Sequence, residues 1–255
     1  MKKAFLLLAT SFFLQTAAWG QDAIFSLSDF NPIGLNPAFA LPSNGELFAA
    51  SNSRQQWWNL PGPSAAGAAY HMNQFSVLAP FLSQKKKGLG GGVQFFRSSA
   101  GAGKLSLTEF TFTGASRVDQ PMKIFGRRMN VHMGVGVGVG FKQFHLDWSN
   151  LTFASQLDPF YGLISSMPLI NPQPTSTAIA PVANVGVKFK STFKSDNRTV
   201  KSWQWGAALY QVNKPGLSFF DENTLLQRRF NAHASDTETG ETAWSIHHNA
   251  SINVT

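Results

Sequence analysis

Four glycines alternate with valines in the stretch MNVHMGVGVGVGFKQFHLDW, residues 129–148, and a glycine-rich run can form a phosphate-binding loop. Such a loop needs a strand, then a glycine-rich turn, then a helix with a lysine or an acidic partner. Here a valine separates each glycine from the next, and valine disfavours the backbone conformations of tight turns. We therefore do not expect nucleotide binding here.

Histidine and acidic residues are the other candidates for chemistry. His145 and Asp147 stand two apart, on one face of a strand, where they could support a metal ion or general-base catalysis. A third ligand is missing nearby in the sequence, and His247 and His248 would point to opposite faces of a strand. The sequence also has no Gly-x-Ser-x-Gly or His-Glu-x-x-His motif. We expect no enzymatic activity, no cofactor and no metal.

The glycine run itself has the two-residue period of a β-strand. One face carries small or polar residues, and this predicts the close approach of another backbone or of a side chain across a narrow interior. The other face would contact lipid in a membrane barrel, although the core of a two-layer sandwich predicts the same alternation. This second face consists of Val131, Met133, Val135, Val137, Val139 and Phe141.

Weaker versions of this pattern predict about nine strands at hairpin spacing, with no helical pattern between them. The fold class we expect is all-β, an antiparallel up-and-down outer-membrane β-barrel. An odd number of strands and an end inside a strand indicate a barrel that is incomplete at the C-terminus in this chain, or one completed by another chain. The strands are expected at 46–58, 64–75, 89–97, 104–117, 129–148, 182–193, 202–212, 229–234 and 242–255.

Composition and the first residues indicate export. The chain has 255 residues, 13% charged residues and no cysteine, and its formal charge of +8 is modest. Residues 1–20 have the basic start, short apolar stretch and small terminal residues of a signal peptide, which predicts Sec-dependent export and cleavage before Gln21. Residues 21–45 would form a periplasmic or lumenal segment and residues 46–255 the barrel. No nucleic-acid partner is expected.

The predicted connections differ in charge. The second, fourth and sixth are basic and would lie together at one end of the meander, whereas the long inserts 149–181 and 213–227 would lie at the other end. The eighth, Asp236–Glu241, is acidic and breaks this rule. With a periplasmic N-terminus, the basic turns face the periplasm and could contact a partner there; the candidate residues are Lys85, Lys86, Lys87, Arg127 and Arg128.

The stretch after the predicted cleavage site is QDAIFSLSDFNPIGLNPAFA, with Phe30, Asn31 and Pro32 followed by Asn36, Pro37 and Ala38. It resembles the mature start of the PorP/SprF family of type IX secretion membrane proteins, although Phe39 replaces a tyrosine and Leu41 a glycine. The two Asn-Pro pairs in it favour turns, which lead either into the first strand or into a plug segment. Further similarities follow in the family's order, and the matching residues are Phe30, Asn31, Pro32, Asn36, Pro37, Ala38, Arg54, Gln56, Trp57, Asp147, Trp148, Gln211, Asn213 and Pro215.

The resemblance implies a non-enzymatic outer-membrane protein of type IX secretion or gliding motility. It would be embedded in outer-membrane lipid and would anchor secretion components, or a secreted adhesin through its C-terminal sorting domain. Two alternatives remain open at this point. One is a porin-like passive channel, and the other is a soluble secreted β-sandwich with a binding role.

Overall fold

The computed structural model of the chain describes most of the predicted barrel and part of the segment before it. The described residues are 30–42, 45–57, 69–84, 86–101, 103–124, 127–148, 151, 153, 156–158, 160–163, 176–196, 199–219, 225–240 and 245–254. The predicted signal peptide 1–20 lies outside the described residues.

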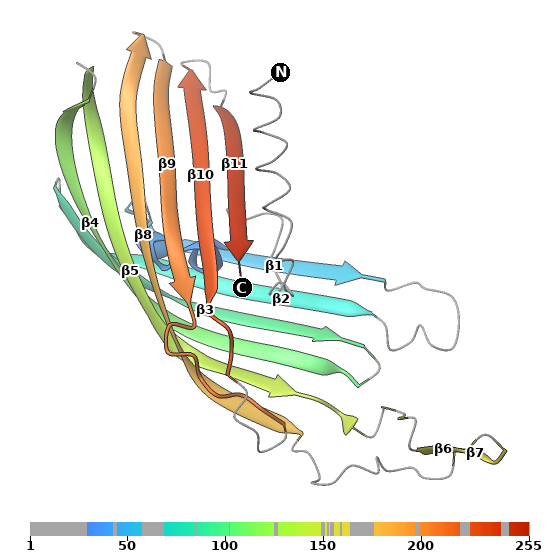
Figure 1. The fold of residues 1–255 in the computed structure, drawn as a ribbon. Coiled ribbons are helices and arrows are strands. Elements are labelled where there is room, and N and C mark those ends of the chain that lie inside the picture. The colour runs from blue at the N-terminus through green and yellow to red at the C-terminus, as the bar shows by residue number, and fades with distance from the viewer. Residues whose placement is uncertain are drawn as a thin grey trace, which may run out of the picture.

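Nine strands form one antiparallel sheet in which each strand pairs with the next one along the chain. The sheet curls into a half-barrel with β1 and β11 as its open edges (Figure 1). The predicted up-and-down order and the incomplete barrel are therefore confirmed. The strands are β1 Phe48–Gln56, β2 Tyr70–Ser83, β3 Lys87–Ala100, β4 Leu105–Ile124, β5 Arg127–His145, β8 Thr177–Asp196, β9 Thr199–Tyr210, β10 Arg229–Gly240 and β11 Ser245–Val254.

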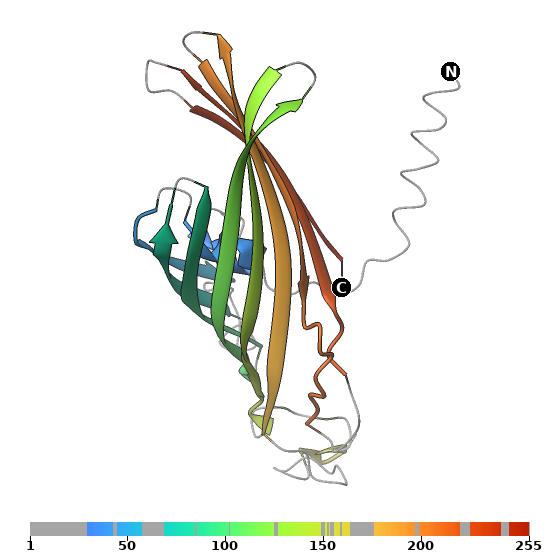
Figure 2. The same cartoon turned by 90° about the vertical axis from the view of Figure 1, so that its left-hand side faces the viewer.

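Three smaller features complete the described chain. A two-stranded ribbon, β6 Leu157–Asp158 and β7 Gly162–Leu163, lies in the long insert after β5. Two single helical turns, α2 Pro32–Leu35 and η2 Pro37–Ala40, lie on the concave side of the sheet (Figure 2). In the described part of the chain, no helix has the length and apolar character needed to cross a membrane.

The two faces of the sheet differ as the alternation in β5 predicts. Val135, Val137 and Val139 are 56%, 56% and 60% exposed on the convex face, whereas Gly134, Gly136 and Gly138 are buried on the concave face. Neighbouring strands repeat this pattern, with exposed Phe112 outside and buried Thr111 inside. No second sheet packs on the convex face within the described residues. The sandwich alternative required such a layer, so the fold does not support it.

β2, β4 and β8 run beyond the bounds that the sequence pattern predicted, and the additional part of each strand contains a proline. Pro80 lies inside β2, Pro121 inside β4 and Pro181 inside β8. Each lies at a position where its strand has a neighbour on one side only. Proline has no N–H group to donate, and it is tolerated at such positions because no second neighbour requires one.

The prediction of an acidic connection at Asp236–Glu241 was also wrong in its bounds. β10 continues to Gly240, so Asp236 lies within a strand and pairs with Trp203 of β9.

β4 and β8 each contain 20 residues, about twice the 9–11 residues that cross a bilayer as a strand. The longest strands therefore extend beyond any apolar band of ordinary height.

Candidate functional site

The described part of the N-terminal segment, residues 30–42, occupies the interior of the half-barrel, and we call it the plug. Each of its Asn-Pro pairs begins one helical turn. The side chain of Asn31 accepts a hydrogen bond from the Gly34 N–H at 3.2 Å, and that of Asn36 accepts one from the Ala38 N–H at 2.8 Å. Asparagine is a favoured N-cap and proline a favoured first residue of a helix, so this sequence specifies two short capped turns.

Glycines of the sheet make room for the plug. A side chain added at Gly136 of β5 would collide with the main chain of Pro37 and Ala38. One added at Gly186 of β8 would collide with the side chain of Asn36. The small face of the glycine run therefore permits close approach of another backbone, as its alternation predicted.

Polar side chains of the sheet hold the plug by its main chain. Tyr210 donates its hydroxyl hydrogen to the Ile33 carbonyl at 2.7 Å, and Asn231 donates to the Leu35 carbonyl at 2.7 Å. In the opposite direction, the Asn36 amide donates to the main-chain carbonyls of β8 and β9. Buried polar groups are costly without partners, and these bonds satisfy several of them at once.

An apolar cluster and a lysine also hold the plug against the sheet. Ile33, Ala40 and Leu41 pack with Leu78 and Ala115 of the sheet, and all five are buried. Near them, the ammonium group of Lys188 lies 4.8 Å from the centre of the Phe39 ring and 3.4 Å from the Leu41 carbonyl oxygen. Lys188 therefore joins β8 to the plug through a cation–π contact and a weak hydrogen bond.

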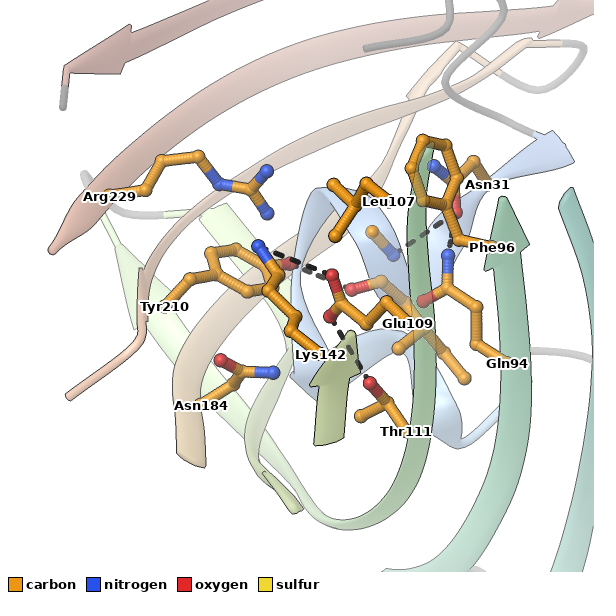
Figure 3. Close-up of a pocket in the computed structure, with 12 residues that line it drawn as sticks. Asn31, Gln94, Phe96, Leu107, Glu109, Thr111, Lys142, Asn184, Tyr210 and Arg229 are labelled. Carbon is orange, nitrogen blue, oxygen red and sulfur yellow. Dashed lines mark hydrogen bonds and ion pairs between the residues drawn. The ribbon is translucent and has the colours of Figure 1, made fainter. Parts of the chain in front are cut away.

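A small polar cavity lies between the plug and the sheet (Figure 3). Its volume is about 40 Å³, which is room for a few water-sized groups. Lys142 of β5 and Glu109 of β4 form an ion pair at 3.3 Å in its wall, and Thr111 donates to Glu109 at 3.2 Å. The Arg229 guanidinium lies 4.0 Å from the centre of the Tyr210 ring. The cavity can bind water or a small polar group.

A second ion-pair group lies on the same concave face, further toward the basic turns. Asp119 contacts Arg117 at 3.1 Å and His132 at 2.7 Å. Among the described residues, no group of three or more His, Cys, Asp or Glu side chains could hold a metal ion. The side chains of His247 and His248 lie outside the described residues, and His145 bonds to Thr177 at 3.0 Å.

The remaining sequence-predicted residues divide between the two ends of the sheet. One end of the sheet, which we call the basic end, carries Lys86 and Lys87. The start of β5, at Arg127 and Arg128, lies at the same end. Lys85 and the side chains of the two arginines lie outside the described residues. Arg54 and Gln56 are in the edge strand β1, toward the opposite end, which we call the loop end.

Three of the predicted motifs lie at the loop end. Trp57 follows β1 there and is 59% exposed. Trp148 follows β5 and its ring lies 5.9 Å from that of Phe219. After β9, the Asn213 side chain accepts from the Ala183 N–H at 3.1 Å and donates to the Pro181 carbonyl at 2.9 Å. Its neighbours Gln211 and Pro215 are buried.

Sequence reasoning missed the residues that hold the plug, chiefly Tyr210, Asn231 and Lys188. The available signal was the regular occurrence of small or polar residues at inward positions of late strands, for example Asn184, Gly186 and Lys188 in β8. This signal identifies the inner face, but it does not reveal that the chain's own N-terminal segment is the partner.

A single curved sheet with an apolar outer face and a polar, plugged interior defines a β-barrel type of membrane protein. The family of type IX secretion system membrane proteins PorP/SprF matches residues 18–255, and the chain belongs to this family. It is thus a membrane component of type IX secretion, and the family is one of secretion components rather than of enzymes. No curated protein and no solved structure shows a significant match to the chain.

Proposed function

We propose that this chain is a closed outer-membrane anchor of type IX secretion, which holds a secreted surface protein at its loop end. The observation that carries this proposal is the plug. Residues 30–42 occupy the interior, and their main chain is bonded to inward side chains of β9 and β10. A passive channel needs an open interior, whereas an anchor does not.

The loop end is the proposed binding surface for the secreted partner, which would be an adhesin or its C-terminal sorting domain. It consists of the connections after β5 and after β9, residues 146–176 and 211–228, with Trp148 and Phe219 packed together where the two meet. Aromatic side chains are frequent anchors in protein interfaces. This end faces the cell exterior in the proposal, and a role in gliding motility would follow if the retained protein is a motility adhesin.

The basic end is the proposed contact with periplasmic secretion machinery. Lys86 and Lys87 lie there, with Arg127 and Arg128 at the start of β5. Clustered positive charge attracts acidic surfaces and speeds their association. The residues that precede the plug, from about residue 21, would belong to the same side.

Conductance tests the closed anchor against the channel. The purified protein is inserted into planar bilayers, and we expect no stable open pore at low voltage. A stable open pore in the wild-type chain would overturn the closed interior and support the passive channel.

Site-specific cross-linking tests the two surfaces. A photoreactive residue is placed at Leu225, which is 53% exposed at the loop end, or at Lys87 at the basic end. In cells, we expect Leu225 to capture a secreted protein and Lys87 to capture a periplasmic one. The reverse pattern would refute the proposed orientation, and identification of the captured proteins would separate secretion from motility.

A further inference from the structure

The polar cavity between the plug and the sheet lies close to the loop end. Tyr210 is the last residue of β9 and Arg229 the first residue of β10, and both line the cavity. Lys142, near the end of β5, also lines it. Residues of the plug form another part of the lining. A group that comes from the loop end would therefore reach the cavity without passing the plug.

The lining of this cavity carries an excess of positive charge. Among the described residues that line it, the charged groups are the ammonium of Lys142, the guanidinium of Arg229 and the carboxylate of Glu109, which gives a net charge of +1. Glu109 is paired with Lys142, so it offsets only one of the two cations. Burial makes an uncompensated charge costly, and one further carboxylate would make the site neutral.

Buried donors of the cavity can serve an oxygen acceptor. Lys142 is 4% exposed and Asn184 is 3% exposed. An ammonium group has three N–H donors, so Lys142 can bond to Glu109 and to a further acceptor at once. The side-chain oxygen of Asn184 accepts from the Gln211 N–H at 3.0 Å, and its NH2 group faces the cavity (Figure 3). Arg229 is only half-buried, so it lies nearer to the solvent than Lys142.

The size of the cavity selects the anionic group. Its volume is about 40 Å³, which corresponds to about three water positions at roughly 10–15 Å³ each. A carboxylate has one carbon and two oxygen atoms, and its oxygens accept several hydrogen bonds. A tetrahedral phosphate group is larger and would have to displace the plug or the side chains of the wall. The cavity therefore fits a carboxylate better than a phosphate.

We propose that this cavity binds one carboxylate group of an extended peptide that enters from the loop end. Lys142 and Asn184 donate to it at the buried side and Arg229 at the solvent side, and such charge-assisted hydrogen bonds are the strong ones. A chain terminus suits the site, because it places a carboxylate ahead of a single backbone. The inference rests on the proposed function, in which the loop end holds a secreted protein, and it adds the chemical group that this protein presents.

Matched peptides test this site. The full chain in detergent micelles is titrated with a short peptide of alanine and serine that carries an uncharged fluorophore at its N-terminus, and fluorescence anisotropy gives the Kd. We expect the peptide with a free C-terminal carboxylate to bind roughly ten-fold more tightly than its C-terminal amide. An amidated peptide that ends in glutamate distinguishes the two sources of a carboxylate. If only that peptide binds, the assignment to a chain terminus is wrong.

Three variants make the test specific. Arg229→Gln removes a charged donor and should weaken binding of the free-terminus peptide several-fold. Glu109→Gln raises the net charge of the lining and should tighten the same binding, whereas damage to the fold would weaken it in both variants. Arg97→Gln is the matched control, because Arg97 follows the cavity-lining Phe96 but is exposed on the outer face. It should leave the affinity unchanged. If Glu109→Gln does not fold, the comparison of Arg229→Gln with Arg97→Gln decides.

The outcomes separate this site from the proposed function. Equal affinities for the free and the amidated terminus, or equal losses in Arg229→Gln and Arg97→Gln, would overturn the carboxylate site. If Leu225 still captures a secreted protein in cells, the proposed function survives that result. A preference for the free terminus without any capture at Leu225 would keep the site and remove the retention role. Acetate that binds while none of the peptides does would refute the entry of a peptide.

Discussion

The side-chain amide of Asn36 donates a 2.9 Å hydrogen bond to the main-chain carbonyl of Val187, which is 151 residues away in the sequence. The same amide donates to the Ala207 carbonyl at 3.2 Å, and Asn36 is fully buried. One side chain of the plug therefore bridges β8 and β9. The contact is made to main-chain atoms, so it depends on the path of the strands rather than on the side chains at 187 and 207.

We predict that Asn36→Ala destabilises the protein by about 2–4 kcal/mol. The change removes two buried hydrogen bonds to the sheet and the bond that caps η2, and each bond contributes about 0.5–1.5 kcal/mol. Urea unfolding in lipid vesicles measures the loss. Asn213→Ala is the matched control, because Asn213 also joins two main-chain groups but is exposed. A control that loses as much as Asn36→Ala would show that burial of the plug is unimportant.

Gly136→Val should displace the plug. A side chain at 136 would occupy the place of the Pro37 and Ala38 main chain, and overpacking costs about 1–3 kcal/mol. We expect faster proteolysis of residues 30–42 and stable pores in planar bilayers. Gly114→Val is the control on the next strand, where the added side chain meets open space. If Gly136→Val and Gly114→Val changed proteolysis and conductance equally, the changes would not come from a collision with the plug.

The ion pair between Glu109 and Lys142 should stabilise the cavity wall. Lys142 is 4% exposed, so Glu109→Gln leaves a buried ammonium group without its carboxylate, and we expect a loss of about 2–3 kcal/mol. The double variant with Lys142→Met should recover most of this loss, because it removes the uncompensated charge. Urea unfolding of the two single variants and the double variant gives the coupling free energy between Glu109 and Lys142. A double variant as unstable as the sum of the two singles would contradict a direct pairing.

The sequence predicted the sheet well because its signal is local. Strict alternation along β5 identifies both faces without any knowledge of neighbouring strands. The ends of β2, β4 and β8 were predicted less well, because a proline such as Pro121 breaks a strand only where two neighbours need its N–H group. That condition depends on the register of the adjacent strands, which the local pattern does not contain.

The interior was less predictable for the same reason. The Asn-Pro pairs predicted turns, and both turns are present as capped helical turns. The glycines predicted the close approach of a backbone, yet nothing near residue 136 identifies Pro37 as that backbone. Contacts such as Tyr210 with Ile33 join positions 177 residues apart, and only the curvature of the whole sheet brings them together.

The placement of the convex face in hydrocarbon can be tested with one charge at two depths. Val137 is 56% exposed on the outer face of β5, in the middle of the apolar region, and Met122 is 42% exposed on the outer face of β4, near its basic end. An arginine at the centre of a bilayer costs about 2–4 kcal/mol, and one near the interface costs about 0–1 kcal/mol. We expect Val137→Arg to show the larger loss and Met122→Arg the smaller one, measured by urea unfolding in phospholipid vesicles. Equal and small losses at both positions would mean that water or another protein, rather than lipid, covers the valines of β5.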